Sequence, residues 1–355
     1  MKTKITMAVA AGLTAIATAS AGVSPASAST TGEAVAAPAA GRAGFVAAPA
    51  ARQTGVSAAA ATEAHHGHDS IRYASIKGCS TKDGAPKPCG KWRLVMHDGM
   101  TRLLPDAQTT ALDAKGKPAV YNAAPIAVSG NGRSVAYFTK SGRLAVRTLG
   151  GGVKLLAKDA LPRVAQYDVT LKMSDDGAKL AAALGGDKPK ATRLFDTATG
   201  RLLGTVPAEE TPLGFSADGG ELLASADGGE SVTDLTAYSD TGERLLKATP
   251  PQVVSANGPQ ALSGDGRTVA NVVRSRKPEL VLWDMQTDQV TRKKIKLPAG
   301  DLMMVDWTGE TQVTLHLQKG STITIVQIDT ETGAVRQRDR YAFLKDTFVF
   351  AACGG

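Results

Sequence analysis

Short runs rich in Val, Leu and Ala recur along most of the chain, and polar turns separate them. One kind of turn combines a Ser with an Asp-Gly or Asn-Gly pair, as in "MSDDGAKLAAA". It occurs at Ser129, Ser174, Ser216 and Ser263, and a degenerate copy, "VDWTGETQVTL", aligns at Asp306. These positions are 45, 42, 47 and 43 residues apart. A second kind, as in "FDTATGRLL", returns at Asp196, Ser239, Asp284 and Asp329, which are 43, 45 and 45 residues apart. Two independent markers therefore indicate a repeat of about 44 residues.

Each repeat predicts four short antiparallel strands. Asp-Gly and Thr-Gly pairs supply the positive φ that tight hairpins need. The Ser-x-Asp-Gly turn joins the first strand to the second, and the Asp-x-x-Thr-Gly turn joins the third to the fourth. Four-stranded repeats of this length, with no helical pattern between them, predict an all-β fold, the β-propeller of four-stranded blades.

Five full repeats extend over residues 124–340, and the remaining apolar runs predict how the ring closes. "IRYASIK", "KWRLVMH" and "TRLLPD" at the front supply three strands, and "AFLKDTFVFAAC" at the back supplies one. The C-terminal strand is expected innermost in the first blade, where it covers edges that would otherwise stay open. We predict six blades, or seven if residues 106–123 and the C-terminus hold more strand.

One repeat carries a recognisable signature. The segment "LVLWDMQTDQV" resembles the end of the third strand of a WD repeat, with Trp283 and Asp284 in the signature places. The chain therefore resembles the bacterial exported WD-repeat and TolB-like propellers over residues 71–355. It departs from eukaryotic WD repeats because their Gly-His pair is missing and only one repeat keeps Trp-Asp.

The N-terminus predicts export. Lys2 and Lys4 precede an apolar stretch that ends in Ala26-Ser27-Ala28, the pattern after which a signal peptidase cuts, so residues 1–28 are expected to be a signal peptide. Residues 29–70 are rich in Ala, Gly and Pro and are expected to form a disordered linker to the propeller at 71–355. We expect a secreted, extracellular protein without a transmembrane segment.

The three cysteines fit an oxidising compartment. Cys79 and Cys89 flank a turn and are expected to form a disulfide. Cys353 is expected at the opposite rim of the first blade, too far away to pair with either. It is expected to be free or to join two copies of the chain.

The chain has a formal net charge of +8, and the predicted topology distributes its charges unequally. Loops that join second to third strands, and each blade to the next, emerge on one side, which we call the loop face. The tight turns emerge on the other side, the turn face, and carry mostly acidic residues. A basic loop face could recruit an anionic polymer, although solvated loop lysines are also common. The candidate binding residues of the loop face are Lys140, Arg143, Lys188, Lys190, Arg274, Arg276, Lys277 and Lys319.

Other chemistry is weakly indicated. His65, His66 and His68 could hold a metal ion, but they lie in the predicted linker without a scaffold. No motif for nucleophilic or acid-base catalysis is present, no cofactor is expected, and basic residues lack the interleaved aromatics that favour nucleic acid.

Three hypotheses follow. The first is an exported, non-enzymatic scaffold that binds an anionic polymer or a protein of the cell envelope through the loop face. The alternative is an exported propeller hydrolase or lactonase with its active site in the central channel, which three or more convergent Asp, Glu, His or Asn side chains would favour. The third is an envelope spacer that dimerises through Cys353.

Overall fold

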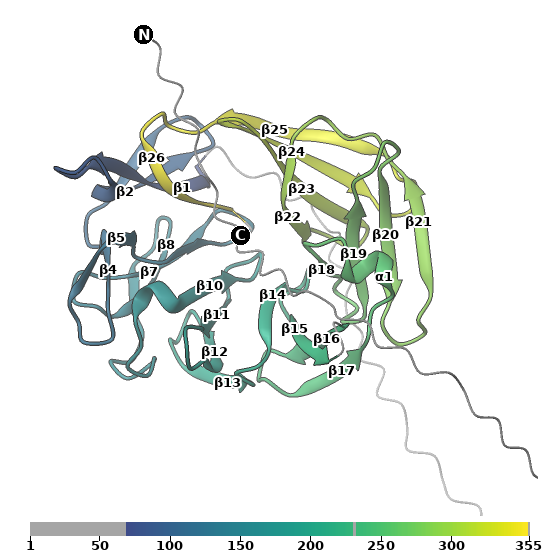
Figure 1. Ribbon diagram of the computed structural model, residues 1–355, viewed down its shortest axis with the longest axis horizontal. Helices are drawn as coiled ribbons and strands as arrows, with labels where there is room; N and C mark the ends of the chain where they lie inside the picture. The colour runs from purple at the N-terminus through teal and green to yellow at the C-terminus, as the bar shows by residue number, and fades with distance from the viewer. Residues whose placement is uncertain (1–68, 230–231, 354–355) are drawn as a thin grey trace, which may run out of the picture. The chain divides into compact units, whose positions relative to one another are not determined.

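The computed structural model describes residues 69–229 and 232–353, which form six four-stranded antiparallel sheets and one two-stranded hairpin. The six sheets are arranged as the blades of a ring, with the C-terminal end of the described chain near its middle (Figure 1). The predicted six-bladed propeller is confirmed. The predicted signal peptide and nearly all of the predicted linker lie outside the described residues.

The first blade is built from both ends of the described chain. Its strands, from the channel outward, are β26 (Thr347–Ala352), β1 (Ile71–Ser80), β2 (Pro86–Met96) and β3 (Thr101–Leu104). β26 pairs antiparallel with β1 from Tyr73 opposite Ala352 to Lys77 opposite Thr347. The predicted closure by the C-terminal strand is therefore confirmed.

The other five blades each take four consecutive strands. Blade 2 holds β6 (Ile126–Val128), β7 (Ser134–Phe138), β8 (Leu144–Thr148) and β9 (Val153–Leu155), and blade 3 holds β10 (Val169–Met173), β11 (Lys179–Leu184), β12 (Lys190–Asp196) and β13 (Leu202–Val206). Blade 4 holds β14 (Thr211–Phe215), β15 (Glu221–Gly229), β16 (Val232–Ser239) and β17 (Arg244–Ala248). Blade 5 holds β18 (Ala261–Leu262), β19 (Thr268–Val273), β20 (Glu279–Asp284) and β21 (Val290–Lys294). Blade 6 holds β22 (Asp301–Trp307), β23 (Gln312–Lys319), β24 (Thr322–Asp329) and β25 (Val335–Ala342).

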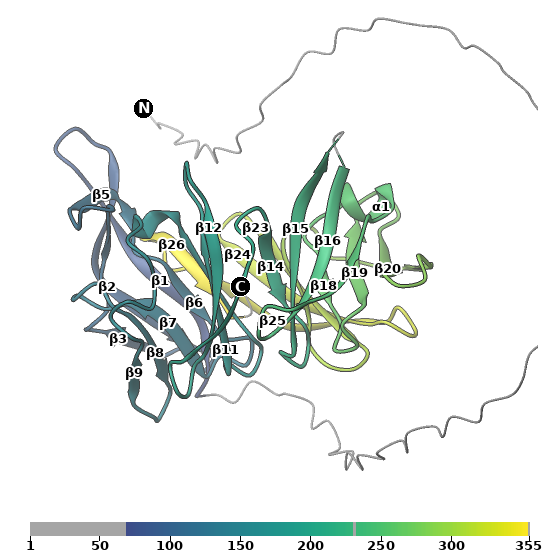
Figure 2. The same cartoon turned by 90° about the horizontal axis from the view of Figure 1, so that it is seen from below.

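The segment that could have made a seventh blade is a hairpin. β4 (Thr110–Leu112) pairs with β5 (Pro118–Ala123) and, in the part of the chain that the structure describes, with no further strand. In the side view of Figure 2, β5 extends to the same side as the β15–β16 hairpin and α1 (Gln252–Ser255), which is the loop face. A 3-10 helix, Gln166–Asp168, precedes β10, and no helix in the described part of the chain is long and apolar enough to cross a membrane.

Hydrophobic clusters fill the spaces between neighbouring blades. Leu180 and Phe138 belong to the cluster between blades 2 and 3, and Trp283 belongs to the cluster between blades 4 and 5. The seam between blades 6 and 1 is aromatic, because Tyr73 stacks on Tyr341 with 5.3 Å between ring centroids and also meets Phe343 edge-on. Burial of these apolar surfaces is the main stabilising term of the ring.

Close contact between adjacent blades makes one glycine essential. A Cβ at Gly204 in β13 would lie 1.6 Å from the carbonyl oxygen of Thr241 in the turn of blade 4. We expect Gly204→Ala to lower the free energy of unfolding by about 1–3 kcal/mol, because the blades must separate to admit the methyl group. Thermal denaturation measures the effect. Gly214→Ala is the matched control, since a Cβ there meets no atom within 4 Å, and equal midpoints for the two variants would contradict the expectation.

Candidate functional site

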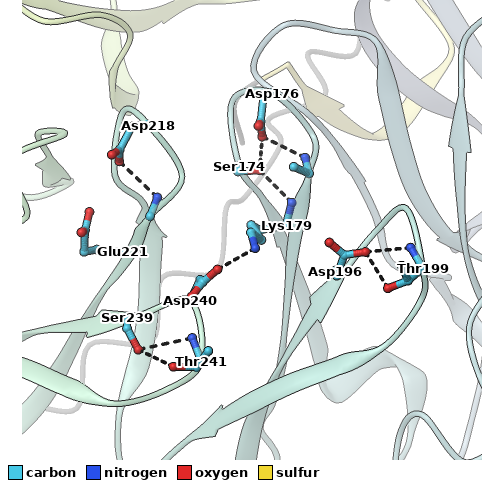
Figure 3. Close-up of polar contacts among 12 residues, drawn as sticks. Ser174, Asp176, Lys179, Asp196, Thr199, Asp218, Glu221, Ser239, Asp240 and Thr241 are labelled. Atoms are coloured by element: carbon cyan, nitrogen blue, oxygen red, sulfur yellow. Dashed lines mark hydrogen bonds and ion pairs between the residues drawn. The ribbon is translucent and has the colours of Figure 1, made fainter. Parts of the chain in front are cut away.

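Most acidic residues of the turn face accept hydrogen bonds within their own turns. In blade 3, the hydroxyl of Ser174 donates to Oδ1 of Asp176 at 2.6 Å, and the same carboxylate oxygen accepts the backbone N–H of Ala178 (Figure 3). Asp196 accepts both the hydroxyl and the backbone N–H of Thr199, and these bonds lower the pKa of Asp196. Their carboxylates are therefore part of the fold.

The turn face also links blades through an ion pair. Nζ of Lys179 in blade 3 donates to Oδ2 of Asp240 in blade 4 at 2.6 Å (Figure 3). In blade 5, the indole of Trp283 donates to Asp288 within the same turn at 2.8 Å. The Trp-Asp signature therefore serves the local turn.

A cavity at the channel end on the turn face has a volume of about 360 Å³, larger than the one among the loops described below. Its wall includes Lys172 and Asp306 from the innermost strands, Asp175 from the first turn of blade 3, and Arg72, His97 and Asp339 from the closing seam. No local motif joins these residues, because they come from three blades.

Asp306 does not occupy the position that the repeat alignment assigned to it. In blade 2, Val128 pairs with Val135 and Ser129 begins the turn, whereas in blade 6 Trp307 pairs with Val313 and Thr308 begins the turn. The alignment at Asp306 was wrong by two positions, because blade 6 has no Ser-x-Asp-Gly motif to mark the turn. Asp306 therefore has the same place in blade 6 as Lys172 has in blade 3: each lies two residues before the first residue of its turn, Thr308 or Ser174.

The surroundings of Asp306 favour its neutral form. Burial raises the pKa of Asp306 to about 8, the attraction of Lys172 opposes this shift, and the negative charge of Asp175 adds to it. A carboxylic acid next to a carboxylate can supply an acid and a base in one site.

The closing seam carries a second polar group of the cavity wall. Nε of Arg72 donates to Oδ2 of Asp339 at 2.8 Å, and Nδ1 of His97 lies 3.5 Å from the same oxygen. The guanidinium of Arg72 also lies 5.2 Å from the ring centre of Tyr341. His97 thus takes part in a polar cluster, and His316, buried in β23, lines the same cavity.

The eight candidate basic residues lie in or beside the second-to-third-strand loops of blades 2, 3, 5 and 6, with Lys190 the first residue of β12 and Lys319 the last of β23. Two of them are used within the fold: Arg143 donates to the carbonyl of Leu156, and Arg274 donates to the carbonyl of Gly300 and lies 3.6 Å from Asp301. The other six are exposed and take part in no ion pair within residues 69–229 and 232–353. They are Lys140, Lys188, Lys190, Arg276, Lys277 and Lys319.

A smaller cavity of about 240 Å³ opens among the loops beside the β4–β5 hairpin. Lys115, Lys158 and Arg163 line it together with Arg143. The first three were missed because they lie between repeats, where no periodic register assigns a position. Their shared positive charge was the only feature of the sequence that could have indicated this pocket.

The cysteines are placed as expected. Cys79 and Cys89 form the disulfide, with 5.9 Å between their Cα atoms. Cys353 is a free thiol, 3% exposed, and its burial disfavours the dimer, which stays a prediction. His65, His66 and His68 lie outside the described residues, and within those residues no group of three or more His, Cys, Asp or Glu could hold a metal ion.

The sheet topology and the two cavities define a six-bladed propeller with a polar channel mouth and a basic pocket among its loops. No family model matches the sequence, and no curated protein matches it significantly. The fold is similar to TolB from Acinetobacter baumannii, at 15% identity and a TM-score of 0.43 over 80% of this chain and 67% of that chain. It is also similar to a putative TolB from Agrobacterium tumefaciens, at 16% identity and a TM-score of 0.44 over 77% of this chain and 90% of that chain. A third similar structure is the propeller domain of the Trilobed protease from Pyrococcus furiosus, with 12% identity and a TM-score of 0.44 over 76% of this chain and 82% of that chain. The expected resemblance to TolB-like propellers is thus present at the level of fold.

Proposed function

We propose that the protein is an exported, non-enzymatic binding propeller whose loop face engages an anionic polymer of the cell envelope. The observation that carries this proposal is the contrast between the two faces. Most acids of the turn face, such as Asp176 and Asp196, are held by hydrogen bonds within their turns, whereas six basic residues of the loop face are exposed and unpaired among the described residues. Charges without internal partners remain available to a ligand.

Export is part of the same proposal. The small-x-small pattern at Ala26-Ser27-Ala28 and the Cys79–Cys89 disulfide both support an oxidising, extracytoplasmic location. Anionic polymers are a class of partner that such a location would offer to a basic surface.

The test is retention of the purified mature protein on immobilised polyglycerol phosphate across a salt series. Each basic residue near an anionic surface is worth roughly 1 kcal/mol. We therefore expect Arg276→Ser, Lys277→Ser and Lys319→Ser together to weaken binding at low salt by about 100-fold. Wild-type retention is expected to fall steeply once the Debye length drops below about 10 Å, near 0.1 M salt.

The matched control removes three exposed basic residues from the other side of the ring, with Arg102→Ser, Arg201→Ser and Arg244→Ser. It changes the net charge equally and is expected to bind like wild type. Equal losses in both triple variants would show that only net charge matters. No retention of wild type at low salt would exclude the proposed function.

One observation favours a second function, a hydrolase or lactonase with its site at the channel mouth. Asp175, Asp306 and Asp339 line the larger cavity together with His97, and such a group of polar side chains at the channel mouth supports an enzyme. The elevated pKa of Asp306 beside the Asp175 carboxylate provides an acid and base pair. Hydrolysis of chromogenic esters and lactones by wild type, abolished in Asp306→Asn, would support this function. No turnover by wild type would remove it.

A further inference from the structure

Three segments from different parts of the chain form the pocket beside the β4–β5 hairpin. They are the hairpin turn at residues 112–116, the loop of blade 2 at 138–144 and the connection between blades 2 and 3 at 157–169. Nε of Arg163 donates to the carbonyl of Ala114 at 2.7 Å and joins the third segment to the first. The buried side-chain carbonyl of Gln166 accepts the backbone N–H of Leu112 at 2.8 Å and joins them again. The pocket is therefore preformed.

Its rim is strongly basic. Lys115, Arg143, Lys158 and Arg163 line the cavity, and none of them is in an ion pair within the described ranges. The single carboxylate of the lining, Asp113, accepts the backbone N–H groups of Lys115 and Lys117 at 2.8 Å each. Four basic residues against one carboxylate leave an excess of positive charge around the cavity.

Its floor is apolar. Phe138 and Leu144 are buried beneath the cavity, and the partly exposed side chains of Leu112, Leu161 and Val164 form its sides. A simple phosphate site would not need such a floor. Pockets that combine an apolar lining with a few placed charges are typical of small organic ligands.

We propose that this pocket binds a small amphipathic anion, an apolar body of about one ring that carries a phosphate or carboxylate group. The apolar body lies against Leu112 and Leu161, and the anionic group meets Lys115 and Lys158 at the rim. A cavity of about 150 Å³ holds benzene, so 240 Å³ leaves room for a ring and its charged group. This inference rests on the proposed basic loop face and deepens it, since it names one built site there and the chemistry of its ligand.

Calorimetric titration of the mature protein with three probes tests the pocket. Phenyl phosphate carries both features, inorganic phosphate carries the charge alone, and benzyl alcohol carries the ring alone. We expect phenyl phosphate to bind at least tenfold more tightly than either of the others. Equal binding of phenyl phosphate and inorganic phosphate would overturn the inference, because the apolar floor would then contribute nothing.

A variant pair locates the binding. Lys115→Ser with Lys158→Ser removes two exposed rim charges that make no side-chain hydrogen bond in the described structure, and it is expected to weaken phenyl phosphate binding at least fivefold. Lys294→Ser with Lys296→Ser, in blade 5, removes two exposed lysines away from the pocket; it is the matched control and is expected to bind within twofold of wild type. An unchanged affinity in the first variant would overturn the inference.

The two proposals fail separately. Polymer retention without binding of phenyl phosphate would leave the loop face as a polymer surface and exclude the pocket. Binding of phenyl phosphate without polymer retention would exclude the proposed function and keep the pocket as a small-molecule site.

Discussion

A chain that ends at Asp346 is expected to lose most of its stability, because it lacks the strand that closes the ring. β26 supplies Phe350 to the aromatic seam, Ala352 opposite Tyr73, and the bridge from Cys353 to Val128 in blade 2. Truncating one packed aromatic side chain typically costs about 3–5 kcal/mol, and the whole strand should cost at least that much. This is a large share of the roughly 5–15 kcal/mol that stabilises a folded domain.

Thermal denaturation and size-exclusion chromatography measure this effect. We expect the midpoint to fall by about 10 °C or more, at roughly 2–4 °C per kcal/mol, and soluble protein to associate through the exposed edge of β1. Deletion of residues 354–355 alone keeps all of β26 and is the control. A monomeric truncated protein with the wild-type midpoint would refute closure by β26.

Asp306→Asn is expected to stabilise the protein at alkaline pH. The pKa of Asp306 rises from an ordinary 3.8 to about 8, chiefly through burial, so the folded state binds more protons than the unfolded state between these values. Stability contributed by the neutral acid is complete below about pH 4 and is lost as the pH rises through about 8. Asn mimics the neutral acid and does not ionise, so the variant avoids this loss.

We expect midpoints of wild type and Asp306→Asn to agree at or below about pH 4 and to differ by at least about 4 °C at pH 9, which corresponds to about 1–2 kcal/mol for a domain of this size. Asp175 and Lys172 are the charged neighbours of Asp306. The buried thiol of Cys353 also lies near Asp306; burial raises the pKa of this thiol to about 12, and the charges of Asp306 and Asp175 add to that shift. Asp187→Asn, in an exposed loop, is the control for losing a carboxylate. A variant that is less stable than wild type at pH 9 would show that Asp306 is ionised and paired.

The repeat was readable because propeller turns are local. Ser174, Asp176 and the glycine after them lie within four residues, and their hydrogen bonds need no distant partner. Positions of the strands, the blade number and the disulfide followed from such spacings. Blade 6 lacks the Ser-x-Asp-Gly motif, so the alignment at Asp306 was wrong by two residues. Asp306 was therefore assigned to a turn although it lies in the strand beside the channel.

The candidate sites were only partly readable. The exposed loop residues Arg276, Lys277 and Lys319 could be assigned to one face from strand alternation alone. Arg143 was assigned to the same surface, but the fold uses its guanidinium to hold the carbonyl of Leu156. Lys158 and Arg163 belong to a connection between blades, and nothing in their spacing relates them to Lys115.

The sequence by itself determined the all-β class, the strand order within each blade and the closing role of the C-terminal strand, because these depend on turns and alternation over short distances. Only the tertiary structure decided which side chains meet across blades: Asp306 with Asp175 and Lys172 at the channel, and the basic rim around the apolar floor beside β4–β5. Contacts between blades depend on the twist and packing of whole sheets, and no local pattern encodes them.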